Sequence, residues 1–199
     1  MRKLLLILLC CFIGGCASYK QLQLNYKLDA PKEKIYQNEH HQKIAVTVDD
    51  KRDPIDNRLI LQNSGPYQNT SVEGGYIAEE PISSILKKGF YDGFKQMNYN
   101  VVGVNSSRYE FVCDINDVNY KNVSNLFIKD LIVEINVTNY LFDNKLGRVI
   151  WEENLTGRGK INNFFGSGNS TNEIKNAFCL AITDLIRKTQ RSRIFRLSN

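Results

Sequence analysis

Histidine and the motifs of hydrolytic catalysis are scarce in this chain of 199 residues. Its two histidines, His40 and His41, are adjacent, which is not the spacing of a zinc site. Neither an H-E-x-x-H nor a G-x-S-x-G motif occurs. Because histidine is the commonest general base, we expect a protein that is not an enzyme, with no catalytic residue, no metal and no other cofactor.

One group of carboxylates could hold a cation. Asp49, Asp50 and Asp53 follow an apolar segment, but their spacing is not that of a calcium loop. We interpret the group as a solvated turn at the end of a strand, with Arg52 paired to a neighbouring carboxylate. A cation site is the alternative.

Charge of one sign is not in large excess. The chain has 26 Lys and Arg against 21 Asp and Glu, a net charge of +5. Two of the positive charges, Arg2 and Lys3, belong to an N-terminal leader, so the remainder carries +3. Such a weak bias does not indicate a nucleic-acid partner.

An apolar run long enough to span a membrane is also missing from the N-terminus. The run over residues 4–13 has ten residues, whereas a spanning helix needs about 20. Arg2 and Lys3 precede it, and the small pair Gly14-Gly15 follows it. This arrangement predicts a signal peptide over residues 1–15.

Three of the five cysteines lie near this leader, and one of them is distinctive. Cys10 and Cys11 are inside the apolar run, whereas Cys16 follows Ile13-Gly14-Gly15. This quartet resembles the lipobox of bacterial lipoproteins. The resemblance implies that the Cys16 thiol receives a diacylglyceryl group, that the leader is removed, and that the new amino end is acylated. An ordinary signal peptide with incidental cysteines is the alternative.

The residue after Cys16 indicates the membrane to which the protein is sorted. Ala17, rather than an aspartate, comes after Cys16. For enterobacteria-like sorting, the lipobox resemblance then implies the outer membrane, with the protein lipid-anchored and facing the periplasm. The other two cysteines, Cys113 and Cys179, are expected to be separately buried thiols rather than a disulfide.

Hydrophobic periodicity divides the rest of the chain. Residues 16–42 are polar and are predicted to form a lipidated tether, with a short strand around residues 22–28 inside it. A single domain over 43–190 and a basic tail over 191–199 follow. The domain begins with an alternating strand at 44–48, and a long polar loop then runs to residue 80. Two helices are predicted, one over 82–97 and one that begins near residue 170.

The intervening segments predict strands. Apolar residues alternate over 109–115, change parity near residues 116–117 as in a β-bulge, and alternate again over 131–137 and 149–155. Gly89 and Gly93 lie within the apolar stripe of the first helix, which indicates a close approach to a neighbour. We therefore predict an α+β fold, with a mainly antiparallel or mixed sheet and two amphipathic helices on one face.

This order of elements resembles the YajG family of bacterial lipoproteins. The segments that carry the resemblance are Cys16 in its lipobox, "VTVDDKRDP" with the residues through Leu59, "KQMNYNVV", the hairpin "DLIVEINVTNYLFDNKLGRVIWEENLTGRG" and the capped last helix. The resemblance implies a small exported α+β domain on a membrane anchor, and it implies no established chemistry.

Two kinds of binding function fit this picture. The favoured one is a non-catalytic binding or structural module that docks on another envelope protein, which predicts an exposed aromatic patch near Tyr67 and Tyr76. The alternative is a binder of a small envelope ligand, a peptidoglycan or lipid fragment, which predicts a concave apolar pocket. In the tail, Arg191, Arg193 and Arg196 are candidates for contact with an anionic surface.

Overall fold

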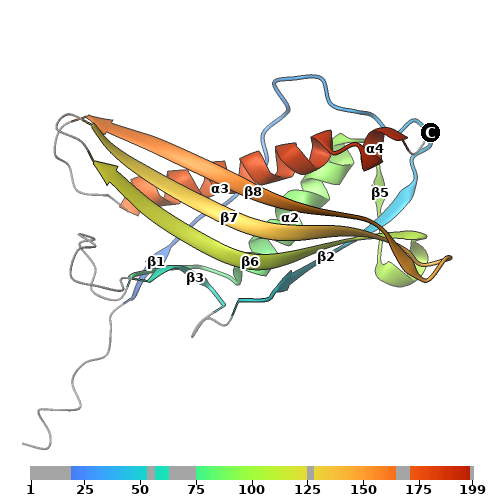
Figure 1. Ribbon diagram of the computed structural model, residues 1–199, viewed down its shortest axis with the longest axis horizontal. Helices are drawn as coiled ribbons and strands as arrows, with labels where there is room; N and C mark the ends of the chain where they lie inside the picture. The colour runs from blue at the N-terminus through green and yellow to red at the C-terminus, as the bar shows by residue number, and fades with distance from the viewer. Residues whose placement is uncertain (1–18, 53–56, 63–74, 125–127, 165–170, 198–199) are drawn as a thin grey trace, which may run out of the picture.

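A five-stranded sheet forms the centre of the computed structural model, which describes residues 19–52, 57–62, 75–124, 128–164 and 171–197 (Figure 1). Its strand order is β5-β2-β6-β7-β8. β2 runs parallel to both of its neighbours, and β6, β7 and β8 form an antiparallel meander. The strands are β2 (Lys43–Asp50), β5 (Asn100–Val101), β6 (Tyr109–Ser124), β7 (Ile128–Asp143) and β8 (Arg148–Phe164).

The three long strands follow the alternation in the sequence. Phe111, Cys113 and Ile115 of β6 are all buried on one face. The register with β7 shifts between Ile115 and Asp117, which confirms the predicted bulge. After it, Val118 continues on the covered face, opposite Ile135 of β7.

Two helices cover one face of this sheet, as predicted: α2 (Ile82–Gln96) and α3 (Thr171–Arg191) (Figure 1). The apolar stripe of each helix is buried against the strands. Burial of a large aliphatic or aromatic side chain contributes roughly 1.5–3 kcal/mol, so these stripes stabilise the helix layer on the sheet. The α+β fold with both helices on one face is confirmed.

The helices approach one another and the sheet closely. A Cβ on Gly93 would lie 2.7 Å from Cγ2 of Ile186 in α3, which confirms the close approach expected from the glycines of α2. A Cβ on Gly159 of β8 would overlap the backbone carbonyl of Ala177. The backbone of α3 therefore rests directly on β8, the last strand of the sheet.

Residues 19–42 are part of the domain, where the sequence analysis expected a tether. β1 (Tyr19–Leu22) pairs in parallel with β4 (Gly75–Ala78), and Leu22, Leu24, Tyr26 and Leu28 are buried. Apolar residues at every second position give this extended segment one apolar edge, which packs on the helices. The sequence analysis expected a short strand around residues 22–28, whereas the paired strand ends at Leu22.

The segment predicted as a long polar loop contains two short strands. β3 (Leu59–Gln62) pairs antiparallel with β4, and the second sheet has the order β1-β4-β3. Both strands have only four residues, which is too short for a periodicity to be recognised. After α2, the chain forms β5 and then the single turn η1 (Val104–Ser106).

The C-terminal segment is also docked rather than free. Arg191 is the last residue of α3, and α4 (Ile194–Leu197) follows it. Phe195 is 1% exposed, with its ring centroid 5.3 Å from that of Phe94 and 5.8 Å from that of Trp151. One aromatic residue among the arginines therefore holds the predicted basic tail against the core.

Candidate functional site: a groove at the β8 edge

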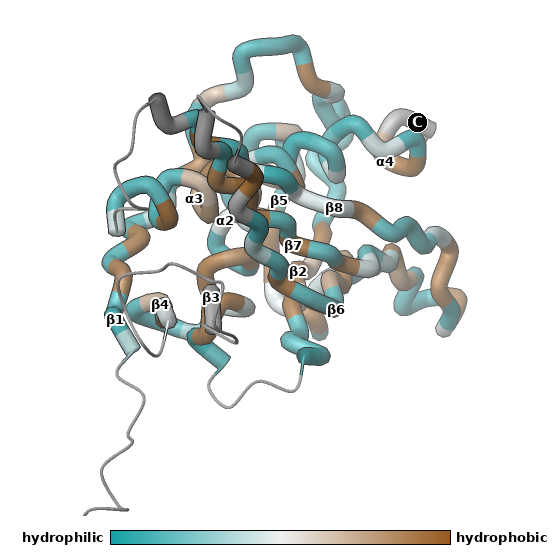
Figure 2. Tube along the Cα trace, turned by 60° about the vertical axis from the view of Figure 1, so that its left-hand side comes forward, coloured by the Kyte–Doolittle hydropathy of each residue, from teal (hydrophilic) through white to brown (hydrophobic). Residues whose placement is uncertain are grey.

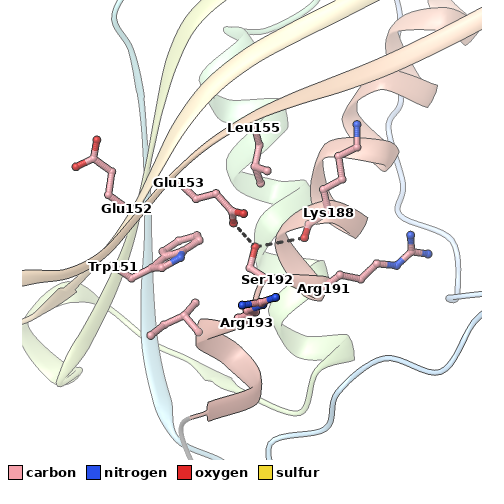
Figure 3. Close-up of a pocket in the computed structure, with 9 residues that line it drawn as sticks. Trp151, Glu152, Glu153, Leu155, Lys188, Arg191, Ser192 and Arg193 are labelled. Atoms are coloured by element: carbon pink, nitrogen blue, oxygen red, sulfur yellow. Dashed lines mark hydrogen bonds between the residues drawn. The ribbon is translucent and has the colours of Figure 1, made fainter.

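A groove of about 580 Å³ lies between the edge of β8 and the end of α3 (Figure 3). We call it the edge groove. Its apolar part consists of Trp151, Leu155 and Ile194. Its polar part consists of Glu152, Glu153, Lys188, Arg191, Ser192 and Arg193.

The end of α3 is fixed to β8 by side chains. The Ser192 hydroxyl donates a hydrogen bond to the Glu153 carboxylate, and the Lys188 ammonium donates one to the Thr156 carbonyl at 2.7 Å. Lys188 also pairs with Asp184 one turn earlier, at 2.7 Å. These contacts hold the rim of the edge groove in place.

Two arginines supply the positive charge of the edge groove. Arg191 forms an ion pair with Glu33 at 2.7 Å, in which both side chains are at least half exposed. Arg193 is exposed, and it has no ion-pair partner among the residues that the structure describes. Glu152 points away from Ser192 and Arg193 (Figure 3). The interior of the groove is thus lined by apolar side chains with cations at its rim.

The other predicted site residues have mixed outcomes. The structure brings Arg191 and Arg193 together at the edge groove, whereas Cys16, Tyr67 and the Arg196 side chain lie outside the described part. Tyr76 is fully buried in β4, so the expected exposed patch at this residue is wrong. Trp151 and Leu155 were missed as site residues, although the one tryptophan of the chain was a usable signal.

The carboxylates after β2 are engaged in local contacts. The Arg52 guanidinium donates to both carboxylate oxygens of Asp50, at 2.8 and 2.6 Å, and to the Leu59 carbonyl at 2.9 Å. This confirms the predicted local pairing of Arg52. Asp53 lies outside the described residues. Within the described ranges, no three His, Cys, Asp or Glu side chains are grouped so that they could hold a metal ion.

Both described cysteines are free thiols, as predicted. Burial raises the pKa of Cys113 far above its usual range, and burial raises the pKa of Cys179 to about 11. A thiol that stays protonated is a poor nucleophile. Neither cysteine therefore marks a reactive site.

At the opposite end, Glu79 fastens the N-terminal segment. Its carboxylate accepts hydrogen bonds from the backbone amides of Leu24, at 2.8 and 2.9 Å, and Asn25, at 3.0 Å. Partial burial alone raises the pKa of Glu79, but the bonds from the backbone outweigh it and hold the pKa below its usual value. This contact lies just before α2 begins, whereas α4 packs near the end of α2.

Comparison with known proteins relates the fold to one solved structure. A Xanthomonas campestris protein of the family DUF330 superimposes with a TM-score of 0.55 at 15% identity, over 82% of this chain and 92% of that one. The likeness shows the fold. A minor lipoprotein from Acinetobacter baumannii gives a TM-score of 0.44 at 12% identity, over 76% and 89% of the two chains.

Comparison of the sequence with known families and curated proteins does not assign the chain to a family. No family model matches the chain, and no curated protein does. None of the helices in the described ranges is both long enough and apolar enough to cross a bilayer.

Proposed function

We propose that the protein is a lipoprotein of the bacterial cell envelope, attached to the outer membrane through lipid on Cys16 and facing the periplasm. It works as a non-catalytic binding module that docks on another envelope protein. The Ile13-Gly14-Gly15-Cys16 quartet behind a charged, apolar leader supports the anchor. Several acyl chains on one residue hold a protein on a membrane firmly, because each buried methylene contributes about 0.8 kcal/mol.

One structural observation carries the rest of the proposal. β1 begins at Tyr19, three residues after Cys16, and three residues span at most about 10 Å. A lipid on Cys16 therefore holds β1 close to the membrane surface. The 15 residues of α2, a length of about 22 Å, separate this end from α4. In the proposed orientation α2 stands away from the membrane, and the edge groove then faces the periplasm.

This orientation bears on the predicted contact of Arg191 and Arg193 with an anionic surface. Both views place β1 and β3 on one side of the molecule and α4 on the other (Figure 1, Figure 2), and β4 lies between β1 and β3. In the proposed orientation these arginines point away from the anchoring membrane. A partner in the periplasm is then within their reach, and the headgroups beside the anchor are not.

Cell fractionation of Cys16→Ser tests the anchor. The variant is expected to leave the membrane fraction, because no acyl chain can be attached to it. Cys11→Ala is the matched control, since it removes a neighbouring thiol and leaves the quartet intact. If Cys16→Ser still partitions into detergent as the wild type does, the anchor is refuted.

A small envelope ligand is the second candidate. The edge groove is concave, with an apolar wall and a few polar groups at its rim, which is the usual form of a small-molecule site. Soluble peptidoglycan fragments can be titrated against the fluorescence of Trp151. Saturable binding of a fragment, weakened by Leu155→Ala, which leaves the Trp151 reporter in place, would favour this candidate over a protein partner.

A further inference from the structure

β8 is an edge strand, and the structure protects only part of that edge. The backbone amide of Arg158 donates to the Asp184 carboxylate at 2.8 Å, and the Thr156 carbonyl accepts from Lys188. These two backbone groups therefore point away from β7. Side chains that satisfy an open edge prevent another strand from pairing there, and α3 supplies this protection at the middle of β8.

Towards the start of β8 the same protection is absent among the described residues. Outward-pointing backbone groups recur at every second residue of an antiparallel strand. Because Thr156 and Arg158 point outward, the amides and carbonyls of Asn154 and Glu152 do so as well. The open stretch is bounded by a register shift between Leu141 and Phe142 of β7, which leaves Ile150 unpaired, and by Lys188 at the other end.

The open edge borders the edge groove. Trp151, Glu153 and Leu155 are on the face of β8 that the helices cover, and their side chains line the groove. A segment paired with Glu152 and Asn154 would thus direct alternate side chains into an apolar pocket. Backbone pairing combined with side-chain pockets is the usual form of peptide recognition by strand addition.

The charges around the edge groove indicate which kind of segment can bind there. Arg193 is exposed, without an ion-pair partner in the described part of the chain. The exposed Arg191–Glu33 pair is of a kind that contributes only about 0–1 kcal/mol, so Arg191 can turn to another carboxylate at little cost. Of the two carboxylates that line the groove, Glu153 is already bonded to Ser192. Glu152 is exposed and directed away from Arg193 (Figure 3). The groove therefore complements an acidic segment.

We infer that the β8 edge at residues 151–155 receives an extended acidic segment of another protein, which adds to the sheet as a short strand. An apolar side chain of that segment packs against Trp151 and Leu155, and a carboxylate pairs with Arg193. The inference rests on the proposed docking function, for which it names the surface and the chemistry of the partner.

The test uses the full-length protein in detergent and a panel of end-blocked seven-residue peptides in which valine and glutamate take turns at the odd positions, with threonine at the even positions, so that both kinds of side chain face the groove. Trp151 is the only tryptophan of the chain, so its fluorescence reports on the groove. We expect saturable binding of the glutamate peptides and at least fivefold weaker binding of peptides with lysine in place of glutamate. Arg193→Glu is expected to reverse that preference.

Two variants of one residue isolate the backbone pairing. Glu152→Pro removes an outward amide without breaking the ladder to β7, because proline is tolerated where the amide faces solvent. Glu152→Ala keeps the amide and removes the same charge. Loss of one hydrogen bond predicts about tenfold weaker binding for the proline variant alone. Should the proline variant fail to fold, glutamate peptides with N-methylated amides must lose their binding to the wild type.

Several results would overturn the inference. These are no response to any glutamate peptide up to about 1 mM, equal binding of the lysine peptides, or equal binding by the proline and alanine variants. Self-association of the chain that Glu152→Pro abolishes would assign the edge to a second copy instead. The anchor is measured separately through Cys16→Ser, so failure here leaves that part of the proposed function standing.

Discussion

The two ends of the molecule are closed by different interactions. At the β1 end, the contacts are hydrogen bonds of the backbone. β1 pairs with β4, and the Glu79 carboxylate accepts hydrogen bonds from the amides of Leu24 and Asn25. At the end of α4, one aromatic side chain, Phe195, is inserted among other rings.

The difference explains where a groove can form. Backbone pairing with β4 satisfies the groups on one side of β1, which is itself an edge of its three-stranded sheet, and Glu79 accepts the two amides that follow soon after it. A side chain that fills a pocket leaves the neighbouring strand edge unpaired, as at Glu152 and Asn154 of β8. In the proposed account, the β1 end lies at the membrane and the end with the edge groove binds the partner.

The largest expected effect comes from Phe195→Ala. Truncation of a fully buried phenylalanine lowers the free energy of unfolding by about 3–5 kcal/mol, and the Trp151 emission should shift to the red as its environment becomes wetter. Urea unfolding measures both. Arg193→Ala, two residues away and exposed, should change stability by less than about 0.5 kcal/mol. Equal effects of the two variants would show that Phe195 does not close this end.

Glu79→Ala should have a smaller effect, at the other end. It removes the acceptor of three hydrogen bonds from the N-terminal segment, and the loss of bonds to a charged group predicts about 1–3 kcal/mol. Glu79→Gln retains one acceptor oxygen and should lose less. Limited proteolysis between residues 19 and 38 should accelerate more in the alanine variant than in the glutamine variant. The account of this end fails if cleavage does not change.

The loss of stability as the pH falls provides a third prediction, with a still smaller effect. The pKa of Glu79 is lower in the folded than in the unfolded chain, so its contribution is present above about pH 4.5 and is lost as the pH falls through the folded pKa. The wild type should therefore lose more stability than Glu79→Gln between about pH 5 and pH 3. Parallel urea titrations measure this difference. Identical slopes would contradict the assignment.

The sequence was sufficient for the central layers of the fold. Strong alternation predicted β6, β7 and β8, and the apolar stripes predicted both helices. The ends were harder to predict for a physical reason. Apolar and polar residues alternate from Leu22 to Leu28, but this segment is ordered only because its apolar side chains pack on the helices.

The edge groove depends even more on tertiary structure. It forms because Gly157 and Gly159 allow the backbone of α3 to rest on β8, which brings Ser192 to Glu153. No local pattern encodes a contact between residues so far apart in the chain. The sequence identified Arg191 and Arg193 as unusual cations, and it could not place them beside Trp151.

The orientation of the two ends can be measured directly with the lipidated protein in vesicles that contain spin-labelled headgroups. The wild type reports on the groove end through its single tryptophan, Trp151. A second protein with Tyr19→Trp and Trp151→Phe reports on the β1 end. The account predicts strong quenching of the tryptophan at position 19 and little quenching of Trp151; equal quenching, or stronger quenching of Trp151, would contradict it.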